Sequence, residues 1–153
     1  MSIPRVFHAI WLGEKSMPAR WAECWATWGR LHPGWQTHLW ADDTWDDMPV
    51  DGDPRERADR LRYALLYLYG GVYVDVDFEC LKPIDPLLLE GVSAFAASEG
   101  GGQISIGILG AEPFHPAFKA ALMALEFSRH RPLLGERSGP TFFTHLVDRH
   151  RLK

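Results

Sequence analysis

Cysteine is scarce in this sequence, because Cys24 and Cys80 are the two cysteines among 153 residues. Two cysteines this far apart are too few for a disulfide framework or for a metal site built on cysteine pairs. The small secreted folds that depend on several disulfides are therefore excluded, and a reduced, cytoplasmic setting is expected.

Long hydrophobic runs and an excess of positive charge are also missing. No apolar stretch approaches the roughly 20 residues of a membrane span, and the first residues lack the apolar core of a signal peptide. Lysine and arginine number 16 against 20 aspartate and glutamate, which gives a net charge of −4. We therefore expect neither a membrane span nor a nucleic-acid partner.

What the sequence does contain is an alternation of strand-like and helix-like segments without repeats or low-complexity stretches. Such alternation is typical of an α/β fold with a mostly parallel sheet flanked by helices, and 1–153 is expected to form a single compact domain. Strands are predicted near residues 4–12, 36–41, 72–77, 92–97 and 103–109. Helices are predicted near residues 17–31, 53–69 and 116–129 and after Gly139-Pro140, with a flexible break at 100–102.

Residues 70–77 (GGVYVDVD) form the most informative segment: a glycine turn, an apolar strand and two aspartates. Side chains alternate along a strand, so Asp75 and Asp77 are predicted to share one face while Val74 and Val76 enter the core. Two carboxylates side by side repel each other, and a hard divalent cation would relieve that repulsion. A solvated strand end or a calcium loop is the alternative.

The helix before this strand carries its own start and stop signals. Asp53 as N-cap, Pro54 and Glu56 mark its beginning, and Gly70 marks its end. A buried stripe is predicted at the positions Ala58, Leu61, Leu65 and Leu68. Asp59 and Arg62, which lie three residues apart beside that stripe, form either an exposed ion pair or a pair directed at the same cleft as the aspartates.

These segments together resemble a known family. The segments are residues 3–13 (IPRVFHAIWLG), 32–40 (HPGW followed by LW), 58–63 (ADRLRY), 66–77 (LYLYGGVYVDVD) and 81–85 (LKPID). In this order they resemble the D-x-D sugar-transferase family, which includes yeast-type initiating α-mannosyltransferases, capsular polysaccharide transferases and, more distantly, the glucosylating clostridial toxins. The resemblance covers roughly residues 3 to 145.

The resemblance implies a metal-dependent, retaining glycosyltransferase with a GT-A-like, Rossmann-type domain. Its donor would be a UDP- or GDP-sugar, its cofactor Mn²⁺ or Mg²⁺, and its acceptor an unidentified glycan, lipid or protein. The implied metal ligands are Asp77 directly and Asp75 through water. The implied catalytic residues are Asp75, Asp77, Asp59 and Arg62. The implied donor-binding residues are Trp11, Asp59, Arg62, Tyr63, Gly71, Asp75, Ser138 and Gly139.

Several of these positions have a plainer interpretation. Trp11, matched to the aromatic residue on the nucleotide base, could equally be a core tryptophan. The turn at Ser138-Gly139, matched to a segment near the donor phosphates, could be an ordinary helix start. His115 is expected to be a cap or packing residue. Trp21, Cys24, Trp25 and Trp28 have the spacing of a helix packing face.

The sequence departs from the family pattern at two places. An asparagine common in the family is replaced within residues 103–107, where Ser105 could carry its contact. The family's C-terminal histidine and tryptophan have no clear counterpart, and His145 and His150 are weak substitutes. One alternative function is therefore a non-catalytic module that binds a nucleotide-sugar and metal. A phosphatase of the haloacid dehalogenase type is disfavoured, because Phe78-Glu79 follows the second aspartate.

Overall fold

The computed structural model describes residues 1–44 and 52–150, without the side chains of the last two of these residues. The described residues form a five-stranded sheet in the order β2-β1-β3-β5-β4. The strands are β1 (Val6–Ile10), β2 (Gln36–Trp40), β3 (Gly71–Val74), β4 (Ala94–Gly100) and β5 (Gln103–Ala111). The helices are α1 (Ala19–Leu31), α2 (Pro54–Tyr69), α3 (Asp85–Leu89), α4 (Pro116–Ser128), α5 (Leu134–Arg137) and α6 (Pro140–His150).

The predicted α/β fold with a mostly parallel sheet is confirmed. β1 pairs in parallel with both β2 and β3, whereas β5 runs antiparallel to β3 and to β4. Within the described sheet, β5 is therefore the strand that runs against the other four. Parallel strands end at the same edge, so the residues that follow β1, β2 and β3 lie close together.

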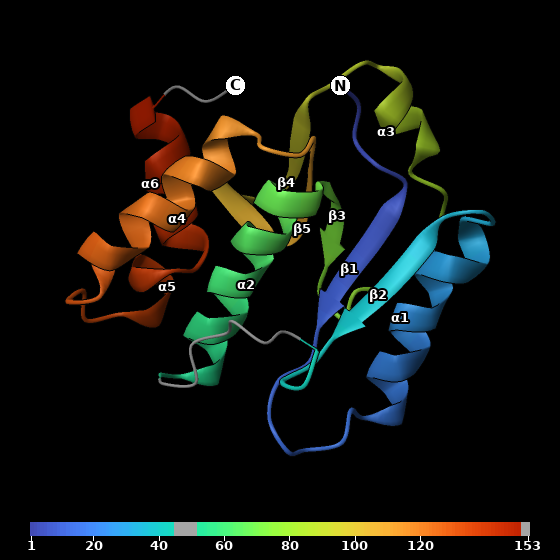
Figure 1. The fold of residues 1–153 in the computed structure, drawn as a ribbon, viewed down its shortest axis with the longest axis horizontal. Coiled ribbons are helices and arrows are strands. Elements are labelled where there is room, and N and C mark those ends of the chain that lie inside the picture. Colours follow the sequence, from blue (N-terminus) through green and yellow to red (C-terminus); the bar gives the residue numbers. More distant parts are fainter. Residues whose placement is uncertain (45–51, 151–153) are drawn as a thin grey trace.

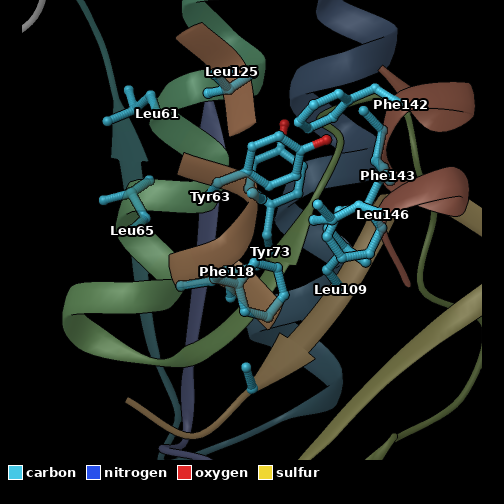
Figure 2. Close-up of a cluster of buried hydrophobic side chains, with 14 of the residues drawn as sticks. Leu61, Tyr63, Leu65, Tyr73, Leu109, Phe118, Leu125, Phe142, Phe143 and Leu146 are labelled. Carbon is cyan, nitrogen blue, oxygen red and sulfur yellow. The ribbon is translucent and has the colours of Figure 1, made fainter. Parts of the chain in front are cut away.

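Helices cover both faces of the sheet (Figure 1). On one face, α2, α4 and α6 bury aromatic and leucine side chains against Tyr73 and Leu109 (Figure 2). On the other face, Phe7, Val72 and Val74 pack with Trp28 of α1. The tryptophan face predicted for α1 is thus a packing face, with Trp28 4% exposed.

The passage from α2 into β3 depends on two consecutive glycines. Gly70 (φ 64°) and Gly71 (φ 95°) both adopt left-handed backbone conformations, which disfavour side chains. A Cβ atom on Gly71 would also lie 2.5 Å from Cγ1 of Val6 on the neighbouring strand. The glycines therefore allow α2 to end and β3 to begin directly beside β1.

Some local expectations were wrong. Leu68, predicted in the buried stripe of α2, is 43% exposed because the helix passes the edge of the core at its last turn. The break predicted at residues 100–102 is confirmed, since these residues form the tight turn between the antiparallel strands β4 and β5. The short helices α3 and α5 were not predicted, since four or five residues are too few to show a period. Part of the predicted loop at residues 42–53 lies outside the described residues.

His8 is a buried polar residue that links β1 to the glycine turn. Trp40 donates from Nε1 to Nδ1 of His8 at 3.2 Å, so the proton of the neutral imidazole resides on Nε2. Nε2 then donates to the Gly70 carbonyl at 2.9 Å. Burial lowers the pKa of His8 to about 4, although the Gly70 hydrogen bond opposes this shift.

The His8 environment predicts a loss of stability on mild acidification. Between pH 6.5 and about 4 the unfolded chain binds a proton on His8 and the folded chain does not. The free energy of unfolding should therefore fall by about 3 kcal/mol across this range through His8 alone. Urea unfolding at several pH values should show this extra loss in the wild type and not in His8→Gln, which keeps a donor for Gly70. Parallel pH curves for the two proteins would contradict the assignment.

Candidate donor-binding site

The two aspartates stand where β3 ends. β3 stops at Val74, and the Phe78 amide donates to the Asp75 carbonyl at 3.0 Å, which closes a turn. Asp75 keeps the strand alternation and lies on the same face as Tyr73, toward α2, whereas Asp77 sits on the turn and is exposed. The prediction that both side chains project from one strand face was therefore wrong, because the strand ends three residues earlier than expected.

Arg62 of α2 lies at the centre of a buried polar network with Asp75. Its Nη1 donates to the Ile106 carbonyl at 2.6 Å, and its Nη2 lies 3.2 Å from Oδ1 of Asp75. The Tyr73 hydroxyl donates to the same Oδ1 at 2.8 Å. The guanidinium carbon lies 4.4 Å from the centre of the Tyr73 ring. One arginine thus joins α2, β3 and β5 behind the Asp75 carboxylate.

Asp59 forms the second carboxylate of this network. Its Oδ1 lies 3.5 Å from Nη2 of Arg62, and the Ser138 hydroxyl donates to its Oδ2 at 2.7 Å. Ser138 is itself held by Tyr63, whose hydroxyl donates to the Ser138 carbonyl at 2.6 Å. The alternative of an exposed Asp59–Arg62 pair is excluded, since their side chains are 11% and 7% exposed.

Burial and charge oppose each other in this network. Burial alone would lower the pKa of Arg62, but Tyr73, Asp75 and Asp59 together raise it above its ordinary value. Burial raises the pKa of Asp59, and Arg62 and Ser138 offset that rise only in part. Burial likewise raises the pKa of Tyr73, so its hydroxyl stays protonated and can donate. The arginine therefore remains charged at every physiological pH.

Gly107 on β5 leaves room for the Asp75 carboxylate. The Asp75 amide donates to the Gly107 carbonyl at 2.8 Å, and a Cβ atom on Gly107 would lie 2.9 Å from Oδ2 of Asp75. Sequence reasoning missed Gly107, Ile106 and Tyr73 as parts of this site. The one available signal was a glycine inside a predicted strand, which often marks a close approach of another group.

The carboxylates of Asp75 and Asp77 suit a hard divalent cation. Oδ2 of Asp75 accepts no hydrogen bond from the described residues, and Asp77 is exposed with no partner among them. No cluster of three or more potential ligands occurs within residues 1–44 and 52–150. Mg²⁺ commonly uses one or two carboxylates and completes its shell with phosphate oxygens and water. This donor set therefore fits a cation that is shared with a bound diphosphate.

Trp11 lies at the same sheet edge as the aspartates. His8 is level with Tyr73 in the parallel pairing of β1 and β3, so the residue after β1 lies close to the level of Asp75. Trp11 is partly exposed, packs edge-on against Trp21 with ring centres 5.5 Å apart, and donates from Nε1 to the Lys15 carbonyl. It is thus a rim residue and not a core tryptophan.

Four other predicted donor-binding residues occupy structural positions. Tyr63 is fully buried, and Gly71 lies at the start of β3, away from the aspartates. Ser138 and Gly139 are buried, with Gly139 packed against Gly135. All four are buried in this structure, and Ser138 reaches the site through its hydrogen bond to Asp59.

The remaining candidates have simple roles. His115 caps α4, since its Nδ1 accepts from the Ala117 amide at 3.3 Å, as the cap interpretation expected. Ser105 accepts from the Gly107 amide at 3.2 Å and is buried beneath the site. His145 lies on α6 and is exposed, whereas the side chain of His150 lies outside the described part of the chain.

The segment that carries the two aspartates is similar to a known family of enzymes. Residues 51–93 match the family model described as "Glycosyltransferase sugar-binding region containing DXD motif". This chain carries the D-x-D sugar-binding region of the glycosyltransferases. The matched residues contain all of α2, β3 and α3 and the aspartate turn.

Two fungal relatives extend the similarity over most of the chain. Inositol phosphoceramide mannosyltransferase 1 of Schizosaccharomyces pombe is 35% identical over 94% of this chain and 50% of its own length. Mannosyl phosphorylinositol ceramide synthase SUR1 of Saccharomyces cerevisiae is 31% identical over 93% of this chain and 41% of its own length. The chain thus spans about half the length of the curated relatives it matches.

A solved structure shares the fold. The structure named PaToxG Glycosyltransferase superposes with a TM-score of 0.79 at 14% identity, over 97% of this chain and 70% of that one. The expected GT-A-like fold is therefore confirmed.

The buried network predicts that Arg62 cannot be replaced even by lysine. Lysine keeps the charge but cannot donate in a fork to Ile106 and Asp75 together. Arg62→Lys should lower the free energy of unfolding by about 2–4 kcal/mol. Arg60→Lys is the matched control two residues earlier, where a partly exposed pair with Glu126 is worth under about 1 kcal/mol. Equal losses in urea unfolding would contradict a central role for Arg62.

Proposed function

We propose that this chain forms the donor-binding part of a metal-dependent, retaining glycosyltransferase. The observation that carries the proposal is the buried Arg62, which positions Asp59 and Asp75 at the edge of the sheet beside the exposed Asp77. The match of residues 51–93 to the sugar-binding family and the named activities of the fungal relatives support it.

The donor we propose is a nucleotide-sugar, with its diphosphate next to Asp77 and Asp75. In a chain with a net charge of −4, two adjacent carboxylates repel a diphosphate. When bound, Mn²⁺ or Mg²⁺ held by Asp77 and Asp75 would stabilise the negative charge on the departing diphosphate. Mannose is the first sugar to test, because the relatives are named mannosyltransferases.

The residues of the chain itself position the donor in this proposal. Arg62 and Tyr73 fix one oxygen of Asp75, so the other oxygen stays directed away from them. Asp59, fixed by Ser138 and Arg62, can accept hydrogen bonds from sugar hydroxyls. Trp11 at the rim offers an aromatic surface to the nucleotide base. Retention of the anomeric configuration is what the family resemblance implies.

The acceptor we propose is a hydroxyl group on a phosphate-linked lipid head group. Two relatives carry inositol phosphoceramide or phosphorylinositol ceramide in their names, which supports this choice. Because the chain spans about half of these relatives, part of the acceptor site could reside outside the shared segment. Binding of the donor with neither transfer nor hydrolysis of the donor by this chain would favour the non-catalytic alternative.

Nucleotide binding should depend on both the metal and Asp77. Calorimetry with UDP and GDP should show binding in Mn²⁺ or Mg²⁺ and at least about tenfold weaker binding in EDTA, because the carboxylates repel an unshielded diphosphate. Asp77→Asn should abolish the metal effect. Glu79→Gln, the same change of charge at an exposed residue two positions on, should leave it intact. Equal affinity in EDTA and in metal would overturn the proposal.

Asp59 should distinguish a nucleotide-sugar from the free nucleoside diphosphate. Loss of one or two hydrogen bonds to sugar hydroxyls corresponds to about 1–3 kcal/mol, or roughly 5- to 150-fold in affinity. Asp59→Asn should therefore weaken binding of the nucleotide-sugar by this factor and leave the diphosphate almost unchanged. Glu99→Gln, the same kind of charge removal at an exposed position of β4, serves as the control. If both ligands weakened equally, the Asp59–Ser138 pair would be purely structural.

A further inference from the structure

An exposed apolar and basic surface lies on α4 and on the turn that leads to α5. Met123, Phe127 and Leu133 are 66%, 78% and 63% exposed. Lys119, Met123 and Phe127 follow each other at intervals of four residues, so they lie on one side of α4. Large apolar side chains gathered on one surface mark an interaction site more often than scattered ones do.

Positive charge accompanies these apolar side chains. Between Phe127 and Leu133 the sequence contains Arg129, His130 and Arg131 and no acidic residue, and these three are exposed. Glu126, the acidic neighbour on α4, is already held by Arg60 at 2.9 Å and by Arg129 at 3.0 Å. In a chain with a net charge of −4, this segment is thus locally basic.

A hollow of about 310 Å³ opens beside the turn. Apolar side chains of α4 and α6 form most of its wall, and the polar side chains of Arg131, Glu136 and His145 complete it. Its lining includes Phe127, Phe142, Leu146, Arg131, Glu136 and His145. The same residues, Phe127 and Arg131, therefore belong both to the exposed surface and to a recess that could receive an apolar group.

This surface adjoins the candidate donor site. Arg137 of α5 pairs with Glu56 in the first turn of α2 at 3.0 Å. The next residue, Ser138, donates to Asp59. Figure 1 shows α4 and α5 alongside α2, on the side of the molecule away from α1. A partner that binds the α4–α5 turn would therefore lie near the proposed donor.

We propose that Met123, Phe127 and Leu133, with Arg129 and Arg131, form a docking surface for an anionic lipid bilayer. Aromatic and aliphatic side chains enter the head-group region, and nearby arginines bind anionic head groups. Docking of this kind differs from spanning, and no helix in the described part of the chain is long and apolar enough to cross a membrane. That docking would bring the donor site to a lipid acceptor rests on the proposed function. The docking itself does not depend on that function.

The test uses the purified chain with vesicles of phosphatidylcholine alone or mixed with phosphatidylglycerol, in EDTA and without any donor. Sedimentation should show binding to the mixed vesicles that is at least about tenfold stronger than to phosphatidylcholine and that weakens with added salt. Phe127→Ser with Leu133→Ser should lower this binding at least about tenfold. Arg129→Ala with Arg131→Ala should also lower it, by about tenfold or more.

Matched controls lie elsewhere on the molecule. Leu81 and Leu89 are 82% and 78% exposed near α3, so Leu81→Ser with Leu89→Ser removes similar apolar area. Arg20→Ala with Arg30→Ala removes the same charge from α1. Both control pairs should bind vesicles like the wild type.

Three results would overturn the docking proposal. They are absence of binding to both vesicle types, equal losses in the test and control pairs, and a dimer in analytical ultracentrifugation that Phe127→Ser with Leu133→Ser dissolves. The last result would assign the surface to a second copy of the chain. Since no donor or metal is present, failure of docking is distinct from failure of the proposed glycosyltransferase function.

Discussion

The buried charge of Arg62 is the constraint on which the site depends. A guanidinium with a side chain 7% exposed is costly unless anions and oxygen acceptors surround it. Asp59, Asp75, Tyr73 and the Ile106 carbonyl supply them, and they come from α2, β3 and β5. The contacts that compensate the buried charge of Arg62 therefore also hold the Asp59 and Asp75 carboxylates in position. The stability of the fold and the geometry of the site thus depend on the same contacts.

The glycine turn makes this arrangement possible. Without side chains, Gly70 and Gly71 let β3 start directly after α2 and lie beside β1. Because β3 has only four residues, Asp75 is then level with the middle of α2, where Arg62 is found. A longer connection would let the helix shift along the strand and would separate the arginine from the aspartate. The tight turn thus fixes the position of α2 relative to β3 along the strand direction.

The sequence predicted the local features and missed the long-range ones. The Asp53 cap of α2 is confirmed, since its Oδ1 accepts from the Arg55 amide at 2.8 Å, and so is the approach of Arg62 to the aspartates. The cap follows from the short spacing between Asp53 and the first helical residues. The approach of Arg62 follows from the free-energy cost of burying a charge without an anionic partner. Gly107 and Ile106 could not be predicted in the site, because their place depends on β5 running antiparallel to β3. The turn after Val74 was missed because alternation alone does not show where a strand ends.

The junction of α5 and α6 connects the two surfaces that the proposals concern. Arg137 bonds to α2, and Ser138 bonds to Asp59 directly and to Tyr63 through its carbonyl. The Ser128 hydroxyl at the end of α4 in turn donates to the Arg137 carbonyl, so the exposed turn between these helices is fixed at both ends. A ligand that binds the α4–α5 turn would therefore contact a segment that hydrogen bonds connect, through Arg137 and Ser138, to the Asp59 carboxylate of the candidate donor site. The hydrogen bonds that position Asp59 are therefore continuous with those that hold the α4–α5 turn beside it.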